Sequence, residues 1–272
     1  MVKYRCKKHF CGVDRFWKGS TAEKLTRKRR AELSNFEKNK YFTTAIILAA
    51  GVGSRFDFSV PKQTVSLLGK SIIARAAEPF YRCDDVDCIV VVTRSEDIDF
   101  VNRELHFLGT KLHAVISGGK CRAESASLGF LAVPDCTTHV AIHDAARCLI
   151  KEEDISSVIR EAYRSGAASA VSLIASTVKR VLDNSIVETV SRDELVLAET
   201  PQVFSCDIYK RALSAVLNFE KQTDDNMMVE NIGVKISPVI LSYENPKITY
   251  PHDLAYAEFL QRRREKECLD LE

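Results

Sequence analysis

The residues best suited to chemistry begin with a glycine loop that directly follows an apolar run. After Thr44–Leu48 the chain continues with Ala49, Ala50, Gly51, Val52, Gly53, Ser54 and Arg55. Glycines let a backbone approach a phosphate closely and point N–H groups at it, and Arg55 adds a forked cationic donor. The loop lacks the ending of a Walker A motif and the third glycine of the dinucleotide fingerprint. It is a candidate phosphate loop of another kind, although a tight turn alone would also explain it.

Three further segments carry candidate ligands for a nucleotide. Lys62, next to a proline, supplies a point charge suited to phosphate. Residues 117–125 form a second glycine-rich turn, whose open backbone could hold a base or ribose. In the run His-Asp-Ala-Ala-Arg at 143–147, Asp144 could hold Mg²⁺ together with phosphate oxygens, and Arg147 could bind a second phosphate. Asp144 could equally cap a helix, with Arg147 on the surface.

Alternating strands and helices must position these segments. We expect strands at 44–48, 88–93, 112–116, 139–143 and 168–174, and helices around 71–82, 121–132 and 152–165. This alternation predicts an α/β fold with a doubly wound, mostly parallel, Rossmann-like sheet that is covered on both faces. Three of the candidate segments directly follow a strand, at the edge where such folds bind ligands.

The alternation stops at residues 176–200, where polar and β-branched residues mix around Asp183 and Asn184. This pattern predicts a projecting β-hairpin. Helices at 207–218 and 224–232, a strand at 234–241 and a helix at 251–265 are expected to complete the fold. We therefore place the catalytic domain at 43–265, with a tail at 266–272.

Composition excludes several classes of protein. The chain has 272 residues, of which 46% are hydrophobic, as in a globular protein rather than a disordered one. No apolar stretch is long enough for a transmembrane helix. The nine cysteines are scattered and odd in number, which argues against a disulfide framework and favours a reducing compartment. We expect a cytoplasmic protein without a membrane partner.

The net charge of +2 conceals a basic N-terminal extension. Residues 1–42 carry 13 Lys and Arg against 4 Asp and Glu, a balance of +9, whereas residues 43–272 carry −7. The extension lacks the apolar core of a secretory signal, and organellar targeting stays open. Charge runs are usually solvated surface, so we expect a flexible appendage rather than a nucleic-acid partner.

Taken together, the motifs resemble those of a known enzyme family. They occur in the order L-A-A-G-x-G-x-R, P-K-Q, G-G-x-x-R-x-x-S and H-D-A-A-R, and continue with Thr200–Phe204, Thr223–Asp225 and Asn245–Thr249. This collinear set resembles the 2-C-methyl-D-erythritol 4-phosphate cytidylyltransferases over residues 44–262. That family transfers CMP from CTP to methylerythritol phosphate, with release of pyrophosphate, in non-mevalonate isoprenoid synthesis. The resemblance implies Mg²⁺ as cofactor, CTP and a phosphorylated polyol as partners, and a homodimer joined by the β-arm at 176–200.

The resemblance also implies roles for individual residues. Arg55, Lys62 and Lys247 would be catalytic, and Lys247 would hold the acceptor phosphate for attack. The nucleotide would be bound by Ala49, Ala50, Gly51, Gly53, Gly119, Arg122, Ser125 and Ala145. The acceptor would be bound by Asp144, Arg147, Lys179 and Lys247, with Asp144 also facing the metal. Because the acceptor phosphate is itself the nucleophile, such a reaction needs cations and in-line positioning rather than a Ser-His-Asp triad.

Departures from the family pattern lie mostly in the acceptor half. Ala175 stands where some members carry an arginine that positions the acceptor, so Lys179 or Arg180 would have to substitute for it. Cys148 replaces a usual proline, and Glu199 replaces a usual glutamine. Two alternatives follow from these departures. The acceptor could be a pentitol phosphate such as ribitol 5-phosphate, or the chain could be a non-catalytic binding protein on the same fold.

Overall fold

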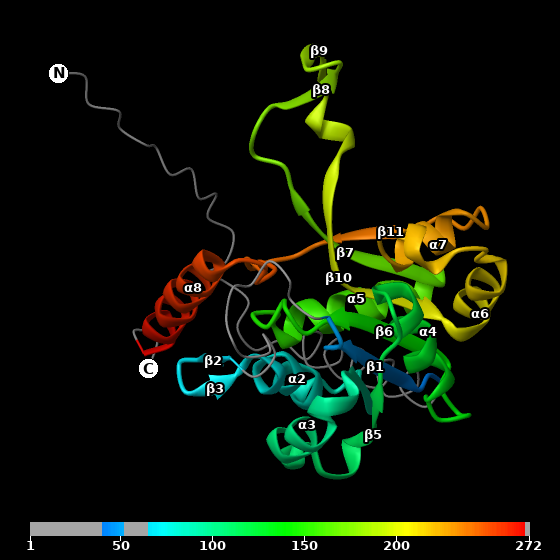
Figure 1. Ribbon diagram of the computed structural model, residues 1–272, viewed down its shortest axis with the longest axis vertical. Helices are drawn as coiled ribbons and strands as arrows, with labels where there is room; N and C mark the ends of the chain where they lie inside the picture. The colour runs from blue at the N-terminus through cyan, green and yellow to red at the C-terminus, as the bar shows by residue number, and fades with distance from the viewer. Residues whose placement is uncertain (1–39, 52–64, 270–272) are drawn as a thin grey trace, which may run out of the picture. The chain divides into compact units, whose positions relative to one another are not determined.

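The computed structural model describes residues 40–51 and 65–269 (Figure 1). The expected site residues Gly53, Arg55 and Lys62 lie outside the described residues, as does nearly all of the basic extension. The chain divides into two units, residues 1–40 and 41–272, and the description below concerns the second.

A seven-stranded sheet forms the centre of this unit, in the order β11-β7-β10-β6-β1-β4-β5. The strands are β1 (Thr43–Leu48), β4 (Cys88–Thr93), β5 (Leu112–Ser117), β6 (His139–Asp144), β7 (Ala167–Leu173), β10 (Val196–Ser205) and β11 (Ser237–Ile240). Within this sheet only β10 runs antiparallel to its neighbours, β6 and β7. The mostly parallel α/β sheet predicted from the sequence is confirmed.

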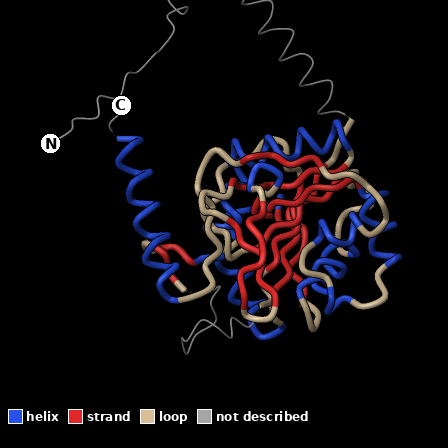
Figure 2. Tube along the Cα trace, turned by 90° about the horizontal axis from the view of Figure 1, so that it is seen from above, coloured by secondary structure: helices blue, strands red, loops and turns tan. Residues whose placement is uncertain are grey.

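Helices cover both faces of the sheet, as Figure 2 shows. One face packs on α2 (Ile72–Arg82), α3 (Ile98–Glu104) and α5 (Glu152–Ser165), and α8 (Pro251–Leu269) joins the same hydrophobic cluster through Ala257 and Leu260. The other face packs on α4 (Arg122–Leu131), α6 (Cys206–Ala215) and α7 (Asp225–Glu230). Because successive strand residues point to opposite faces, Ala45 and Ile47 join the first cluster while Ile46 and Leu48 join the second. The helix α8 continues beyond residue 265, where we had placed the end of the domain.

Several helix boundaries follow from local chemistry. The side chains of Ser71, Ser205 and Asp224 each accept a hydrogen bond from the backbone N–H three residues later, so they cap α2, α6 and α7. Gly166 ends α5 with a φ of 83°, in the left-handed region that favours glycine. The smaller elements are β2 (Ser66–Leu67), β3 (Lys70–Ser71), and the 3₁₀ turns η2 (Ser95–Asp97), η3 (His106–Lys111), η4 (Arg192–Glu194) and η5 (Phe219–Lys221). None of the described helices is long and apolar enough to cross a bilayer.

The strand β10 is the main element that the sequence pattern did not predict. Pro201 argues against a central strand, because proline has no N–H for the ladder. In the structure, residues 199–204 are buried between β6 and β7. The register with β7 shifts between Ala198 and Gln202, so Pro201 falls outside the paired residues. A local irregularity therefore lets a proline-containing segment occupy the middle of the sheet.

The hairpin expected at 176–200 is present as β8 (Val178–Leu182) and β9 (Ser185–Val190), which pair only with each other. It projects away from the main sheet, as Figure 1 shows. Asp183 and Asn184 form its turn with φ of 47° and 59°, as a tight hairpin turn requires. We call β8, β9 and their turn the arm. Its side chains Val181, Leu182, Ile186 and Val187 are 52–68% exposed.

Candidate active site

Two glycine-containing loops meet at the carboxyl edge of the parallel strands. Ala49–Gly51 follows β1, and Gly118 follows β5. A Cβ atom at Gly118 would lie 2.4 Å from the Cβ of Ala50 and 2.8 Å from Oγ of Ser125. Only glycine permits this close approach. The described part of the first loop therefore packs directly against the second.

The second loop is fixed by the first turn of α4. The Gly119 N–H donates to Oγ of Ser125 at 3.1 Å, and the Ser125 hydroxyl donates to the Cys121 carbonyl at 2.9 Å. The Lys120 N–H donates to a Glu124 carboxyl oxygen at 2.6 Å. Ser125 is only 4% exposed. Its hydroxyl thus holds the loop in this structure, and its cytosine contact stays a prediction.

Next to these loops lies a polar cavity of about 270 Å³. It is lined by residues from α4, β6 and the loop after it, β10, the segment before α7 and the segment after β11, namely Arg122, Asp144, Arg147, Ala198, Glu199, Thr200, Gln202, Thr223, Asp224 and Lys247. Four residues expected from the sequence, Arg122, Asp144, Arg147 and Lys247, are therefore brought together. Ala145 follows Asp144 and is buried, with its N–H donating to the Leu48 carbonyl at 3.0 Å.

Asp144 lies between two cations at the end of β6. The Arg122 Nε donates to its Oδ1 at 2.9 Å, and the Lys247 Nζ donates to its Oδ2 at 2.5 Å. Burial opposes the charge of this carboxylate, but Arg122 and Lys247 outweigh that effect and hold the pKa of Asp144 well below its usual range. The Lys247 side chain is 42% exposed, so its ammonium remains accessible from the cavity. The pair presents an ionised carboxylate and an available cation side by side.

Arg122 connects Asp144 to the carboxylate of Asp225, to which the sequence assigned no role. Its Nη1 donates to Oδ2 of Asp225 at 2.7 Å. Asp225 is fully buried and accepts the hydroxyl of the equally buried Tyr209 at 2.6 Å. Burial opposes the charge of Arg122, but the two carboxylates outweigh it and raise the pKa of Arg122. The T-D-D motif that contains Asp225 was visible in the sequence, but nothing there indicated its partner.

Arg147 is tied to the wall of the cavity. Its Nη1 donates to the Asn245 carbonyl at 2.8 Å and lies 3.1 Å from Oε2 of Glu199. The side chain is 14% exposed. The charge of Arg147 is thus balanced by Glu199, one of the residues that depart from the family pattern. Its expected contact with the acceptor stays a prediction.

His143 connects two walls of the cavity by hydrogen bonds. It is fully buried, and burial lowers its pKa to about 4. The Arg147 carbonyl can only accept, so Nε2 donates to it at 3.1 Å, and Nδ1 accepts the Thr200 hydroxyl at 2.9 Å. Thr200 in turn accepts the Asp144 N–H at 3.2 Å. The neutral imidazole thereby connects β10 to the loop that carries Asp144 and Arg147.

Lys179 does not join this cluster within one chain. It lies on the arm, where its Nζ donates to Thr189 at 2.6 Å, and the neighbouring Arg180 pairs with Glu188 at 2.6 Å. At the base of the arm, the Ala175 carbonyl accepts Arg192 Nη1 at 2.5 Å. A guanidinium therefore stands beside the position where an arginine is missing. Lys179 as an acceptor ligand stays a prediction that needs a second chain.

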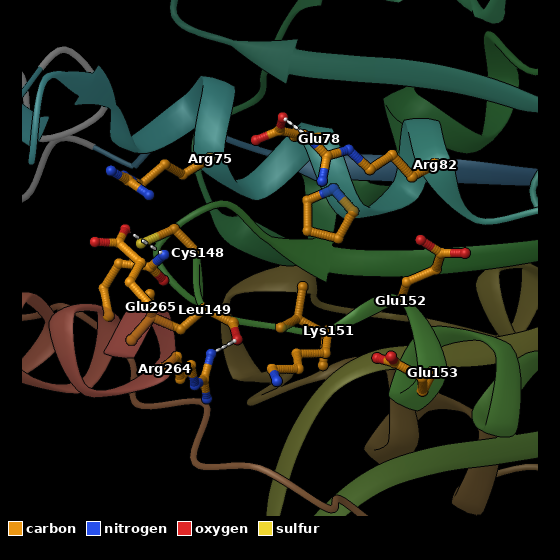
Figure 3. Close-up of a pocket in the computed structure, with 13 residues that line it drawn as sticks. Arg75, Glu78, Arg82, Cys148, Leu149, Lys151, Glu152, Glu153, Arg264 and Glu265 are labelled. Atoms are coloured by element: carbon orange, nitrogen blue, oxygen red, sulfur yellow. Dashed lines mark hydrogen bonds and ion pairs between the residues drawn. The ribbon is translucent and has the colours of Figure 1, made fainter. Parts of the chain in front are cut away.

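A larger cavity, of about 640 Å³, lies elsewhere, between α2, α8 and residues 148–153 (Figure 3). Its lining mixes both signs of charge, with the cations Arg75, Arg82, Lys151 and Arg264 and the carboxylates Glu78, Glu152, Glu153 and Glu265. None of the expected site residues lines it. The smaller cavity, which gathers them, is the candidate active site.

Comparisons with known proteins point to one family. The family model for IspD, 2-C-methyl-D-erythritol 4-phosphate cytidylyltransferase, matches residues 43–263. A protein of that name from Clostridium perfringens is 35% identical over 217 residues, covering 79% of this chain and 96% of the relative. One from Endomicrobium trichonymphae is 37% identical over 216 residues, with the same coverage of both chains.

Solved structures give the same result. A 4-diphosphocytidyl-2C-methyl-D-erythritol synthase from Anaerococcus prevotii superposes with a TM-score of 0.72 at 26% identity, covering 82% of this chain and 97% of the other. A 2-C-methyl-D-erythritol 4-phosphate cytidylyltransferase from Francisella tularensis superposes with a TM-score of 0.67 at 29% identity, covering 80% and 99%. The similarity therefore spans the whole domain that carries the candidate site.

Proposed function

Because the chain belongs to the 2-C-methyl-D-erythritol 4-phosphate cytidylyltransferase family, we propose that it transfers CMP from CTP to 2-C-methyl-D-erythritol 4-phosphate and releases pyrophosphate. It is thus a nucleotidyltransferase. The observation that carries the proposal is the pairing of Lys247 with Asp144 beside two packed glycine loops at one sheet edge. The relatives carry the methylerythritol name and favour neither a pentitol acceptor nor a non-catalytic protein.

In the proposed reaction a phosphate oxygen of the acceptor attacks the α-phosphorus of CTP. One P–O bond forms as the P–O bond to pyrophosphate breaks, and no side chain needs to act as the nucleophile. The chain must instead bring two polyanions together and balance their charge. Lys247 is placed for this task, since Asp144 holds its ammonium at the cavity. Arg55 and Lys62 are proposed to supply the further cations at the α-phosphorus.

We propose that Asp144 also holds Mg²⁺. Its low pKa keeps it ionised at neutral pH, and carboxylate oxygens suit this cation. Among the described residues no group of three His, Cys, Asp or Glu side chains could hold a metal by itself. One carboxylate completed by substrate phosphates and water is a usual arrangement for Mg²⁺. When bound, the ion would neutralise charge on the phosphates.

The arm supports the proposal of a homodimer. Four of its apolar side chains are more than half exposed in one chain, and Ile186 reaches 68%. Contiguous apolar surface of this kind marks an interaction site. A second copy would cover this apolar surface. Lys179 of one chain could then reach the cavity of the other chain. Sedimentation velocity of the full chain should give a dimer, and Ile186→Asp should shift it towards monomer. A monomeric parent would contradict the proposal.

We propose the cytoplasm as the compartment. Cys83, Cys88, Cys121, Cys136 and Cys206 form no disulfide in the structure. Free thiols persist in reducing compartments. Fluorescent fusions with and without residues 1–42 would test this location. Organellar fluorescence that requires residues 1–42 would show a targeting segment instead.

Pyrophosphate release tests the proposed function directly. The full chain is incubated with CTP and Mg²⁺, and with methylerythritol phosphate or ribitol 5-phosphate in parallel. Only the first acceptor should support turnover, and Lys247→Ala should reduce turnover about 100-fold or more. Lys210→Ala, which changes an exposed lysine on α6, is the matched control and should leave the rate unchanged. Turnover with ribitol 5-phosphate alone would reassign the acceptor.

A further inference from the structure

A row of alternating charges leads from the wall of the cavity into the protein interior. It begins at the cavity with Lys247, continues through Asp144 and Arg122, and ends at Asp225, each joined to the next by a bond of 2.5–2.9 Å. The side chains of Lys247 and Arg122 are 42% and 24% exposed, whereas those of Asp144 and Asp225 are 9% and 0% exposed. The row is therefore most exposed at Lys247 and is closed at Asp225.

Asp225 is held from three directions. The Tyr209 hydroxyl donates to its Oδ1 at 2.6 Å, and Arg122 donates to its Oδ2 at 2.7 Å. Its N–H donates to Oε1 of Gln202 at 2.9 Å. Burial, and then Asp225 itself, raise the pKa of Tyr209 well above its ordinary value, so this hydroxyl keeps its proton and donates. Asp225 is therefore fixed in place, and it does not line the cavity.

Arg122 donates to two carboxylates, and this arrangement determines which oxygen of Asp144 is available to Lys247. A guanidinium prefers two parallel bonds to one carboxylate. Here Nη1 donates to Asp225 and Nε donates to Oδ1 of Asp144, while Nη2 is buried without a hydrogen-bond partner. The other oxygen, Oδ2, is left for Lys247. Without the charge of Asp225, nothing would hold Nη1, and Arg122 could turn towards Oδ2 of Asp144 and displace Lys247 from it.

We propose that Asp225, fixed by Tyr209, is a positioning residue that sets the place of the Lys247 ammonium through Arg122 and Asp144. It does not contact the substrate. The inference rests on the proposed function, in which Lys247 holds the acceptor phosphate. It predicts that loss of the Asp225 charge weakens use of the acceptor more than binding of CTP.

The variant Asp225→Asn tests this route. The amide keeps an oxygen for Tyr209 but turns an N–H donor towards Arg122. We expect kcat/KM for the acceptor to fall about 10- to 100-fold, the range seen when a group that orients a ligand from behind is lost. The KM for CTP should change by less than about threefold, within ordinary variation between neighbouring sites. A rise in the CTP KM with the acceptor KM unchanged would overturn the proposal.

A double-mutant cycle with Lys247→Gln separates positioning from a general structural role. If Asp225 acts through Lys247, Asp225→Asn should cost less than about threefold in the Lys247→Gln background. If the two substitutions instead lower kcat/KM for the acceptor by independent factors that multiply, the proposed action of Asp225 through Lys247 is refuted. Tyr209→Phe, which keeps the carboxylate, should show a smaller loss in the same direction and the same coupling. It carries the test if Asp225→Asn does not fold.

The matched control is Asp154→Asn. Asp154 is also a buried aspartate in the first turn of a helix, is 3% exposed, and accepts the Ser242 N–H at 2.9 Å. Its substitution should lower thermal stability without changing the acceptor KM. If the parent enzyme releases no pyrophosphate, the proposed function fails. If the parent is active and Asp225→Asn equals it, only the positioning role fails.

Discussion

Acidification should lower the stability of the fold through protonation of His143. The side chain is fully buried and makes both of its hydrogen bonds as a neutral imidazole, to Thr200 and to the Arg147 carbonyl. Burial lowers the pKa of His143 from its ordinary value of 6.5 to about 4. Below pH 6.5 the unfolded chain binds a proton that the folded chain does not. The stability due to this residue is therefore complete above pH 6.5 and is lost as the pH falls to 4.

The size of the effect follows from these two values. Each pH unit between them costs about 1.4 kcal/mol once the unfolded histidine is protonated. Between pH 7 and pH 5 the loss for one such group is about 2 kcal/mol. Burial also lowers the pKa of His139 to about 4, so the parent should lose a similar amount from that residue. Asp144 does not contribute here, because its carboxyl titrates below the ordinary value of 3.8.

Comparison with His143→Gln isolates the contribution of this histidine. The free energy of unfolding is measured in urea at pH 7 and pH 5 for both proteins, and His139 cancels in the difference. The variant should be less stable at pH 7, and the gap should narrow by about 2 kcal/mol at pH 5. His252→Gln, at a side chain that is 80% exposed, should leave the stability at pH 7 unchanged. An equal gap at both pH values would refute the reasoning.

Four further predictions concern the nucleotide side and the extension. Gly118→Ala should destabilise the fold and raise the CTP KM about tenfold or more, because its Cβ would clash with the first loop. A Cβ atom added at Gly51 would meet nothing within 4 Å, so Gly51→Ala should keep its melting temperature. It should lose affinity for CTP, which calorimetry can measure. Arg55→Ala and Lys62→Ala should each lower kcat about 100-fold or more with circular dichroism unchanged, and near-normal rates in both would contradict their catalytic role. Deletion of residues 1–42 should leave kcat and the CTP KM unchanged, and lost CTP binding would place the extension in the site.

Much of the fold was predictable because its signals are local. Apolar β-branched runs marked β1, β4, β5, β6 and β7, and amphipathic stretches marked the main helices. The short helix α3 was missed because seven residues carry little periodicity. The strand β10 was missed because Pro201 contradicts a strand locally, and only pairing with β6 and β7 places it in the sheet.

The candidate site divides in the same way. The sequence by itself determined which residues could handle polyanions, since glycine loops, Asp144 and Lys247 follow recognisable motifs. Only the tertiary structure decided that Asp144 lies between Lys247 and Arg122, and that Arg122 is shared with the buried Asp225. The physical reason is that a charge can be buried only beside its partner. The partner of Arg122 lies 103 residues away in sequence, where no local pattern can announce it.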